Sequence, residues 1–221
     1  MLWTDLSVHV IDFEGSRETG IVEFGVVTLA GGAVAEVATR LCRPRGRVSA
    51  EDTRVHGLRE ADLAQAESFE AEWERFAALR ASGMLAAHFS GTENALLRAV
   101  WPCPRLSPDF LHPGREALEW GPWIDTGRIA AGSLPRGVSA ALGDVVAMLG
   151  LADELEQAAR RWCPEARRRF HCAPYDALAS ALVLRRLAHD SDGTPWTAAR
   201  AIAASTGDRD RRDDLMQGRL F

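Results

Sequence analysis

The stretch VHVIDFE, residues 8–14, decides the fold expected for this chain. It predicts a buried strand that delivers two acids at its end, before Gly15 lets the chain turn. Positions i and i+2 of a strand project to the same face, so Asp12 and Glu14 should lie side by side. Carboxylates that close do not both stay ionised without a cation between them. A strand that runs into an acidic turn is common, so the interpretation depends on later segments.

Length and composition indicate one α/β domain with a substantial core in a chain of 221 residues. No apolar run approaches the roughly 20 residues of a membrane helix, and no export signal is evident, so we expect a cytoplasmic protein without a membrane partner. The net charge of -5 argues against a protein coated in positive charge for wrapping nucleic acid, but it does not exclude a nuclease. Arginine supplies every positive charge apart from histidine, because the chain has no lysine.

Turn residues and hydrophobic periodicity predict the order of the elements. Strands are expected at residues 21–29 and 34–42, around the turn at Gly31–Gly32, and shorter ones at 84–87 and 123–126. Helices are expected at 68–81, 94–100 (capped by Thr92), 139–149, 151–162, 176–187, and from Thr194–Pro195 to Gly207, with a short one starting near Ser49. Residues 101–122, with five prolines, predict a surface loop lying over a substrate cleft.

A histidine and an acid lie close together late in the chain, in the segment from His171 to Asp176. Asp176 should stand in the first turn of a helix, where the helix dipole favours a carboxylate by roughly 0.3–1 kcal/mol. His171 lies on the loop that leads into this helix, so its side chain would be free to reach over a site that Asp176 helps to build.

The motifs together resemble those of the DEDDh 3′–5′ exonucleases, the family of the bacterial proofreading subunit, ribonuclease T and oligoribonuclease. The order is Asp-x-Glu on the first strand, an acid after a middle strand, and His-x-Ala-x-x-Asp, over most of residues 7–190. Residues 55–58, 62–63, 87–88, 123–126 and 176–177 add to the match. The resemblance implies an RNase H-like α/β fold, with a central mixed five-stranded sheet flanked by helices. The charged residues after Gly207 predict a flexible tail over 208–221, which leaves an exonuclease domain over 1–207.

The resemblance also implies the site residues. Asp12, Glu14 and Asp176 match the metal ligands, Glu93 falls at the position of the second-motif aspartate, and His171 matches the general base. The family uses two divalent metal ions, Mg²⁺ or Mn²⁺, and hard cations of this kind prefer carboxylate oxygens. The subclass with a tyrosine base would need that tyrosine at position 172, which is Cys172, so the histidine version is favoured.

Departures from the family pattern affect the second and first motifs. His88 to Glu93 lacks the usual Asn and Phe, and Glu93 is longer than Asp by one carbon–carbon bond, about 1.5 Å. The site could accommodate the longer side chain of Glu93, or the longer side chain could weaken binding of the second metal ion. Thr is common where Gly15–Ser16 stands, so contacts to the terminal nucleotide should differ.

Five residues are candidates for substrate contacts, and three of them have structural alternatives. The candidates are Phe13, Gly15, Ser16, His56 and Phe89. The two phenylalanines could stack on bases or belong to the core, and His56 could line the groove or cap and pack. Residues 167–169, all arginine, could contact phosphates or form a solvated face.

The last five residues, QGRLF, resemble the pentapeptide that binds the bacterial sliding clamp. Gln217, Leu220 and Phe221 carry the match, and two large apolar residues at the end of a charged tail suit a hydrophobic pocket. A tail folded onto its own domain is the alternative.

The sequence therefore predicts a metal-dependent 3′–5′ exonuclease that releases nucleoside 5′-monophosphates from single-stranded or frayed DNA ends. DNA is favoured over RNA by the tail. A 3′–5′ exoribonuclease keeps the chemistry and changes the substrate. A non-catalytic nucleic-acid-binding module with a drifted second motif is the alternative from another class.

Overall fold

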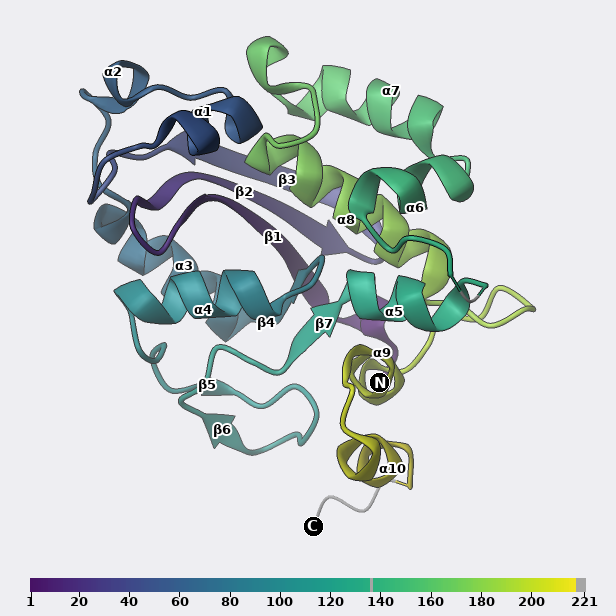
Figure 1. The fold of residues 1–221 in the computed structure, drawn as a ribbon. Helices are drawn as coiled ribbons and strands as arrows, with labels where there is room; N and C mark the ends of the chain where they lie inside the picture. Colours follow the sequence, from purple (N-terminus) through teal and green to yellow (C-terminus); the bar gives the residue numbers. More distant parts are fainter. Residues whose placement is uncertain (136, 218–221) are drawn as a thin grey trace.

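A five-stranded mixed sheet forms the centre of the protein, in a computed structural model that describes residues 1–135 and 137–217. The strand order is β3-β2-β1-β4-β7 (Figure 1). The strands are β1 (Ser7–Ser16), β2 (Gly20–Ala30), β3 (Ala33–Leu41), β4 (Gly83–Ala87) and β7 (Trp123–Asp125). The first three are antiparallel neighbours, whereas β4 runs parallel to β1 and β7 parallel to β4. The predicted fold class is confirmed.

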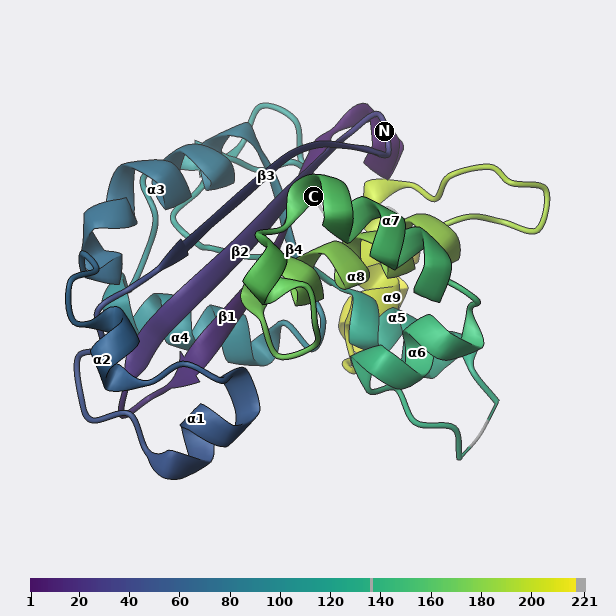
Figure 2. The same cartoon turned by 90° about the horizontal axis from the view of Figure 1, so that it is seen from above.

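Helices cover both faces of this sheet (Figures 1 and 2). The α-helices are α1 (Ala50–His56), α2 (Glu60–Leu63), α3 (Trp73–Ser82), α4 (Gly91–Val100), α5 (Thr126–Ser133), α6 (Leu142–Met148), α7 (Ala152–Trp162), α8 (Ala173–Leu187), α9 (Ala198–Ser205) and α10 (Arg209–Gln217). Short 3₁₀ turns are η1 (Trp3–Asp5), η2 (Phe69–Glu72) and η3 (Glu165–Arg167). Among the described residues no helix is both long and apolar enough to cross a bilayer.

The alternation of β1 divides the core into two layers. Val8 and Val10 belong to the cluster formed with α8, and Ile11 and Phe13 belong to the cluster that includes Phe76 of α3. Burial of a side chain of this size stabilises the fold by about 1.5–3 kcal/mol. Asp12 and Glu14 continue the alternation of Val8 and Val10, so they point to the α8 side of the sheet.

Several predicted boundaries shift because tertiary contacts cap the elements. Helix α4 begins at Gly91, and the Thr92 cap is wrong, because the carboxylate of Asp125 accepts the preceding amides instead. Helix α9 begins at Ala198 after its cap Thr197, so Pro195 is not its first residue. Helix α8 begins three residues before Asp176, and the helix predicted at 68–81 is divided into η2 and α3.

The proline-rich segment 101–122 contains a two-stranded sheet of β5 (Ser107–Pro108) and β6 (Glu116–Ala117). It lies beside α3 and α4, away from α8, so the prediction that it covers the acidic cleft is wrong (Figure 1). The cause is Arg80, which is 3% exposed and donates to the carbonyls of Glu119, Pro108 and Gly121.

The segment predicted as a tail contains a helix. Helix α10 packs on α9 and buries Leu215, so residues 209–217 are structured rather than extended. Flexibility of this segment stays a prediction. Leu220 and Phe221 lie outside the described residues, and Gln217 is the last residue of α10.

Gly25 lets the start of α8 approach the sheet beside the acids. It pairs with Asp12 in the β1–β2 register, and a Cβ atom at position 25 would stand 2.2 Å from the carbonyl oxygen of Ala173. The absence of a side chain at this position therefore brings the helix that carries Asp176 against β2.

We expect Gly25→Ala to lower the free energy of unfolding by about 1–3 kcal/mol, because the methyl group overpacks the contact with α8. Gly132→Ala is the matched control, since a Cβ there meets nothing within 4 Å. In the last turn of α5 it should leave stability unchanged or raise it by up to about 0.5–1 kcal/mol. Urea unfolding measures both, and equal effects of the two substitutions would contradict this account of Gly25.

Candidate active site

Three elements bring four acids and a histidine to one end of β1. Asp12 and Glu14 come from β1, Glu93 from the first turn of α4, and Asp176 from the first turn of α8. Ligand atoms of Glu14, His171 and Asp176 lie within 4.8 Å of one another. Glu14, Glu93 and Asp176 are buried, Asp12 is partly buried, and His171 is exposed.

Burial and mutual repulsion raise the pKa values of the acids on β1. Burial is the main cause for Asp12, whose pKa rises well above its ordinary value, and the charges of Asp176, Glu14 and Glu93 add to it. The pKa of Glu14 rises to about 8, through burial and then through the charges of Asp176 and Glu23. The coupling to residues on α4 and α8 indicates that the acids from all three elements share one site.

The pKa values of the other two acids are raised in the same direction. Burial, followed by the charge of Asp125, raises the pKa of Glu93 to about 8. Burial also raises the pKa of Asp176 to about 7, and the charge of Glu23 adds to this. Raised values on several neighbouring carboxylates are typical of functional sites.

Two buried carboxylate oxygens at this site lack a hydrogen-bond partner within the described part of the chain. They are Oε2 of Glu93 and Oδ1 of Asp176. Unpaired buried charge is costly, and a divalent cation would satisfy these oxygens. The donors that Asp12, Glu14, Glu93 and Asp176 offer are carboxylate oxygens, so these residues fit the hard cations Mg²⁺ and Mn²⁺.

His171 adopts an unusual backbone conformation at the entrance to α8. Its φ is 61°, in the left-handed region, and its amide donates to Oδ2 of Asp176 at 3.0 Å. Such a conformation in a residue other than glycine is strained by roughly 1 kcal/mol or more and persists only where other contacts hold it. The Asp176 carboxylate therefore places the histidine directly beside itself.

Glu23 and Arg167 complete the electrostatics of the site. Glu23 was not predicted to belong to it, and Arg167, predicted to contact phosphate or to lie on a solvated face, is instead paired with Glu23 and mostly buried. Glu23 lies opposite Glu14 in the β1–β2 register and is 1% exposed. Arg167 binds it through two hydrogen bonds, Nε to Oε1 at 2.8 Å and Nη2 to Oε2 at 2.5 Å. Oε2 of Glu23 also accepts the amide of Ala173, at the start of α8. An acid in the middle of the apolar segment IVEFGVV was the signal available in the sequence.

The structure places the candidate substrate contacts near the first motif as follows. Phe13 is 6% exposed and packs against Phe69 and Phe76, so its ring belongs to the core and does not face a substrate. Gly15 has a φ of 131°, and a Cβ there would stand 2.1 Å from a backbone oxygen of Gly20. Ser16 is engaged in the turn, where its amide and hydroxyl contact the hydroxyl of Thr19.

The remaining two candidates differ from each other in exposure. His56 is buried, and its Nδ1 accepts the amide of Leu58, which supports the packing alternative. Phe89 is 43% exposed, with a φ of 58°, and its ring lies against Gly127. Of the two, only Phe89 presents a ring to solvent.

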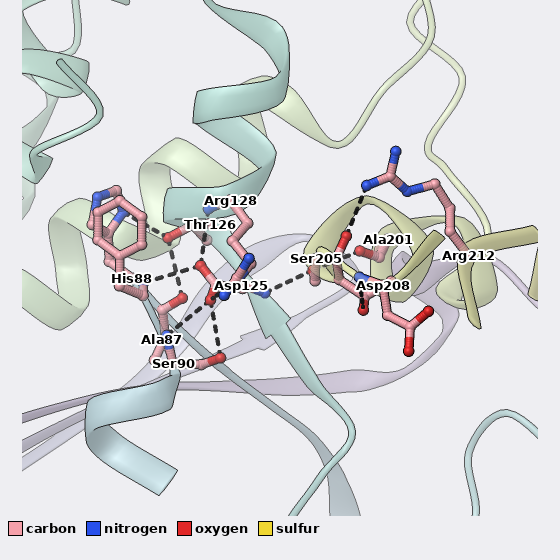
Figure 3. A network of polar contacts seen from close by, with 12 residues as sticks. Ala87, His88, Ser90, Asp125, Thr126, Arg128, Ala201, Ser205, Asp208 and Arg212 are labelled. Carbon is pink, nitrogen blue, oxygen red and sulfur yellow. Dashed lines mark hydrogen bonds and ion pairs between the residues drawn. The ribbon is translucent and has the colours of Figure 1, made fainter. Parts of the chain in front are cut away.

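Asp125 organises the turn that leads to Glu93 (Figure 3). Its carboxylate caps α5 by accepting the amide of Arg128. Its carboxylate also accepts the amides of Phe89 and Ser90 at 3.0 Å each. Its own amide donates to Ser205 of α9 at 2.8 Å. One buried acid therefore connects β7, α5, α9 and the second motif.

Comparisons with known proteins find likeness in structure only. No protein-family model and no curated protein matches the sequence. Exonuclease X, solved with 5′-overhanging duplex DNA, superposes with a TM-score of 0.53 and 17% identity, over 85% of this chain and 97% of that one. The nuclease domain of 3′hExo, a DEDDh family member bound to rAMP, gives 0.55 and 19%, over 81% and 90%.

This chain has the fold of the DEDDh exonucleases. A moderately thermophilic exonuclease I from Methylocaldum szegediense gives a TM-score of 0.62 at 15% identity and covers 96% of this chain. This chain spans 45% of that protein. At these identities the comparison establishes the RNase H-like fold.

Breaking the Glu23–Arg167 pair should be strongly destabilising, because one charge is then left buried without a partner. We expect Glu23→Gln to lower the free energy of unfolding by about 3–5 kcal/mol. The double variant with Arg167→Met should lose less than the sum of the single losses. Glu154→Gln, which removes a more exposed ion pair with Arg185 and Arg186, is the control and should cost about 0–1 kcal/mol. Additive losses in urea unfolding would refute the coupling.

The raised pKa of Glu14 predicts a pH dependence of stability in metal-free protein. The folded state favours the protonated carboxyl, so the contribution of this group is complete below about pH 4.5 and is lost as pH rises through about 8. Glu14→Gln should therefore match the wild-type melting temperature in acid and exceed it above pH 8. With saturating Mn²⁺ the order should reverse, since the variant loses a ligand.

Differential scanning fluorimetry with chelator and with Mn²⁺ measures these melting temperatures. Glu36→Gln, at an exposed position of β3, is the control. A difference between Glu14→Gln and wild type that stays constant from acid to alkaline pH would disprove the interpretation.

Proposed function

We propose that this protein is a metal-dependent 3′–5′ exonuclease that removes nucleoside 5′-monophosphates from the 3′ ends of DNA. The observation that carries the proposal is the convergence of Glu14, His171 and Asp176 within 4.8 Å, next to Asp12 and Glu93, in this fold. Asp12, Glu14, Glu93 and Asp176 would hold two divalent ions. Mg²⁺ or Mn²⁺ bound there would supply Lewis-acid stabilisation of the charge on the phosphate oxygens.

His171 is the proposed general base. Its side chain is exposed, and its backbone amide is held by the hydrogen bond that it donates to the carboxylate of Asp176. A histidine can accept the proton of an attacking water near neutral pH. The oxygen of that water forms a bond to the last phosphorus, and the bond from phosphorus to the 3′ oxygen breaks. The terminal nucleotide leaves with its 5′ phosphate, and the leaving oxygen takes a proton from solvent.

Glu93 favours activity over a non-catalytic module. It stands in the first turn of α4, and its free Oε2 is buried at the site. The turn before it is held by Asp125 through hydrogen bonds to Phe89 and Ser90, so the altered motif keeps an ordered backbone. A drifted motif without function would not need an unsatisfied buried acid.

DNA is the proposed substrate, and RNA is the second candidate. Among the similar structures, exonuclease X is bound to DNA and the 3′hExo domain to rAMP, so this fold accommodates both chemistries. The preference for DNA depends on the clamp-like residues Gln217, Leu220 and Phe221, of which the last two lie beyond the described part of the chain. Clamp binding through that segment stays part of the proposal.

The test is incubation of the protein with 5′-labelled single-stranded DNA, duplex DNA and RNA, with Mn²⁺ or with chelator. We expect a ladder that shortens from the 3′ end, disappears with chelator and is fastest on single-stranded DNA. Asp12→Ala should abolish it, and His171→Ala should reduce the rate by about 10²–10⁴-fold. Asp192→Ala, at an exposed loop position, is the control. Folded wild-type protein that degrades none of these substrates with Mn²⁺ would overturn the proposal.

A further inference from the structure

Four exposed arginines lie on α1, next to its ends, or on the loop that contacts its C-terminal end beside the candidate site. We name this set the α1 basic rim; its members are Arg47, Arg54, Arg59 and Arg169. Arg45 and Arg167 nearby pair with Glu70 and Glu23, but the four rim residues form no ion pair with any described residue. Their charge is available to a partner.

The rim is locally basic in a chain that is acidic overall. Residues 43–59 contain five arginines and only two acids, Glu51 and Asp52, whereas the net charge of the chain is -5. The carboxylate of Asp52 is engaged by the amide and hydroxyl of Ser49, which cap α1. The positive charge is therefore concentrated on this part of the surface.

Contacts connect the rim to the loop that carries His171. Nη2 of Arg169 donates to the carbonyl of His56, the last residue of α1, at 3.3 Å. A Cβ at Gly57 would stand 2.2 Å from the same nitrogen, so the guanidinium lies directly over the end of α1. Both ribbon views show α1 beside the start of α8 (Figures 1 and 2). Helix α1 has seven residues and extends the rim by about 10 Å from Arg169.

We infer that the α1 basic rim binds the phosphates of the single strand on the 5′ side of the nucleotide being removed. Guanidinium groups bind phosphate through paired hydrogen bonds, and contacts to phosphate position a strand without reading its sequence. Val55, which follows Arg54 in the same helix and is 44% exposed, adds an exposed apolar side chain to this surface. This inference rests on the proposed function, and it adds that longer single strands bind more tightly than a dinucleotide.

Binding of 5′-labelled single-stranded DNA by fluorescence anisotropy, over a series of salt concentrations, tests the inference. The Asp12→Ala background with Mg²⁺ prevents cleavage during the measurement. Arg47→Gln/Arg54→Gln should lower the slope of log affinity against log salt by about 0.7 for each lost phosphate contact. Its affinity for a dinucleotide should be unchanged, because so short a ligand does not reach α1. Thermal unfolding checks that the variants are folded.

Arg98→Gln/Arg115→Gln is the matched control, since both residues are exposed and neither forms an ion pair with a described residue. An unchanged slope in the rim variant, or an equal loss in the control variant, would overturn the inference. Polyglutamate is the test for an acidic protein partner. If it binds wild-type protein with the same salt dependence, and the rim variant reduces that dependence equally, the surface belongs to acidic proteins and the inference is overturned. One result separates the two proposals. If metal-loaded wild-type protein hydrolyses no substrate, and the rim variant still shows a smaller salt dependence of binding, the proposed function fails and phosphate binding by the α1 basic rim is retained.

Discussion

Repulsion among buried carboxylates is the constraint on which the structure around the site depends. Glu14, Glu23, Glu93 and Asp176 are each no more than 8% exposed, and they come from four different elements. Placing them together opposes folding unless opposite charge or hydrogen-bond donors compensate. Arg167 compensates Glu23, which ties η3 to β2 and, through the amide of Ala173, to the start of α8. Burial raises the pKa values of Glu14, Glu93 and Asp176, and at Glu14 and Asp176 the charge of Arg167 opposes this only in part.

Buried carboxylates also accept backbone amides at two strained positions beside the site. Phe89 and His171 are the residues other than glycine that have positive φ within the described chain. The amide of Phe89 donates to Asp125, and the amide of His171 donates to Asp176. In each case a buried carboxylate holds a strained backbone, so an acid supplies conformational order as well as charge. These two hydrogen bonds hold the backbone of the second motif and of the histidine in place.

Sequence reasoning recovered the parts of the fold that depend on local pattern. The three antiparallel strands followed from β-branched residues and glycine turns, and the first-turn position of Asp176 followed from apolar periodicity. It failed where a distant group replaced a local signal. Asp125 took over the cap assigned to Thr92, and Arg80 drew the proline-rich segment against α3 rather than over the acids. The helix at 209–217 was not predicted, because these residues are mostly charged and show little apolar periodicity.

By itself, the sequence determined the three antiparallel strands at its start and the alternation that puts Asp12 and Glu14 on one face, because these depend on neighbours within a few residues or across a short turn. Only the tertiary structure decided that Glu23 and Arg167 neutralise each other beside them, since the two are 144 positions apart. It also decided which arginines have acidic partners and which are available to a ligand. Pairing of this kind depends on distance in space, which no local pattern along the chain encodes.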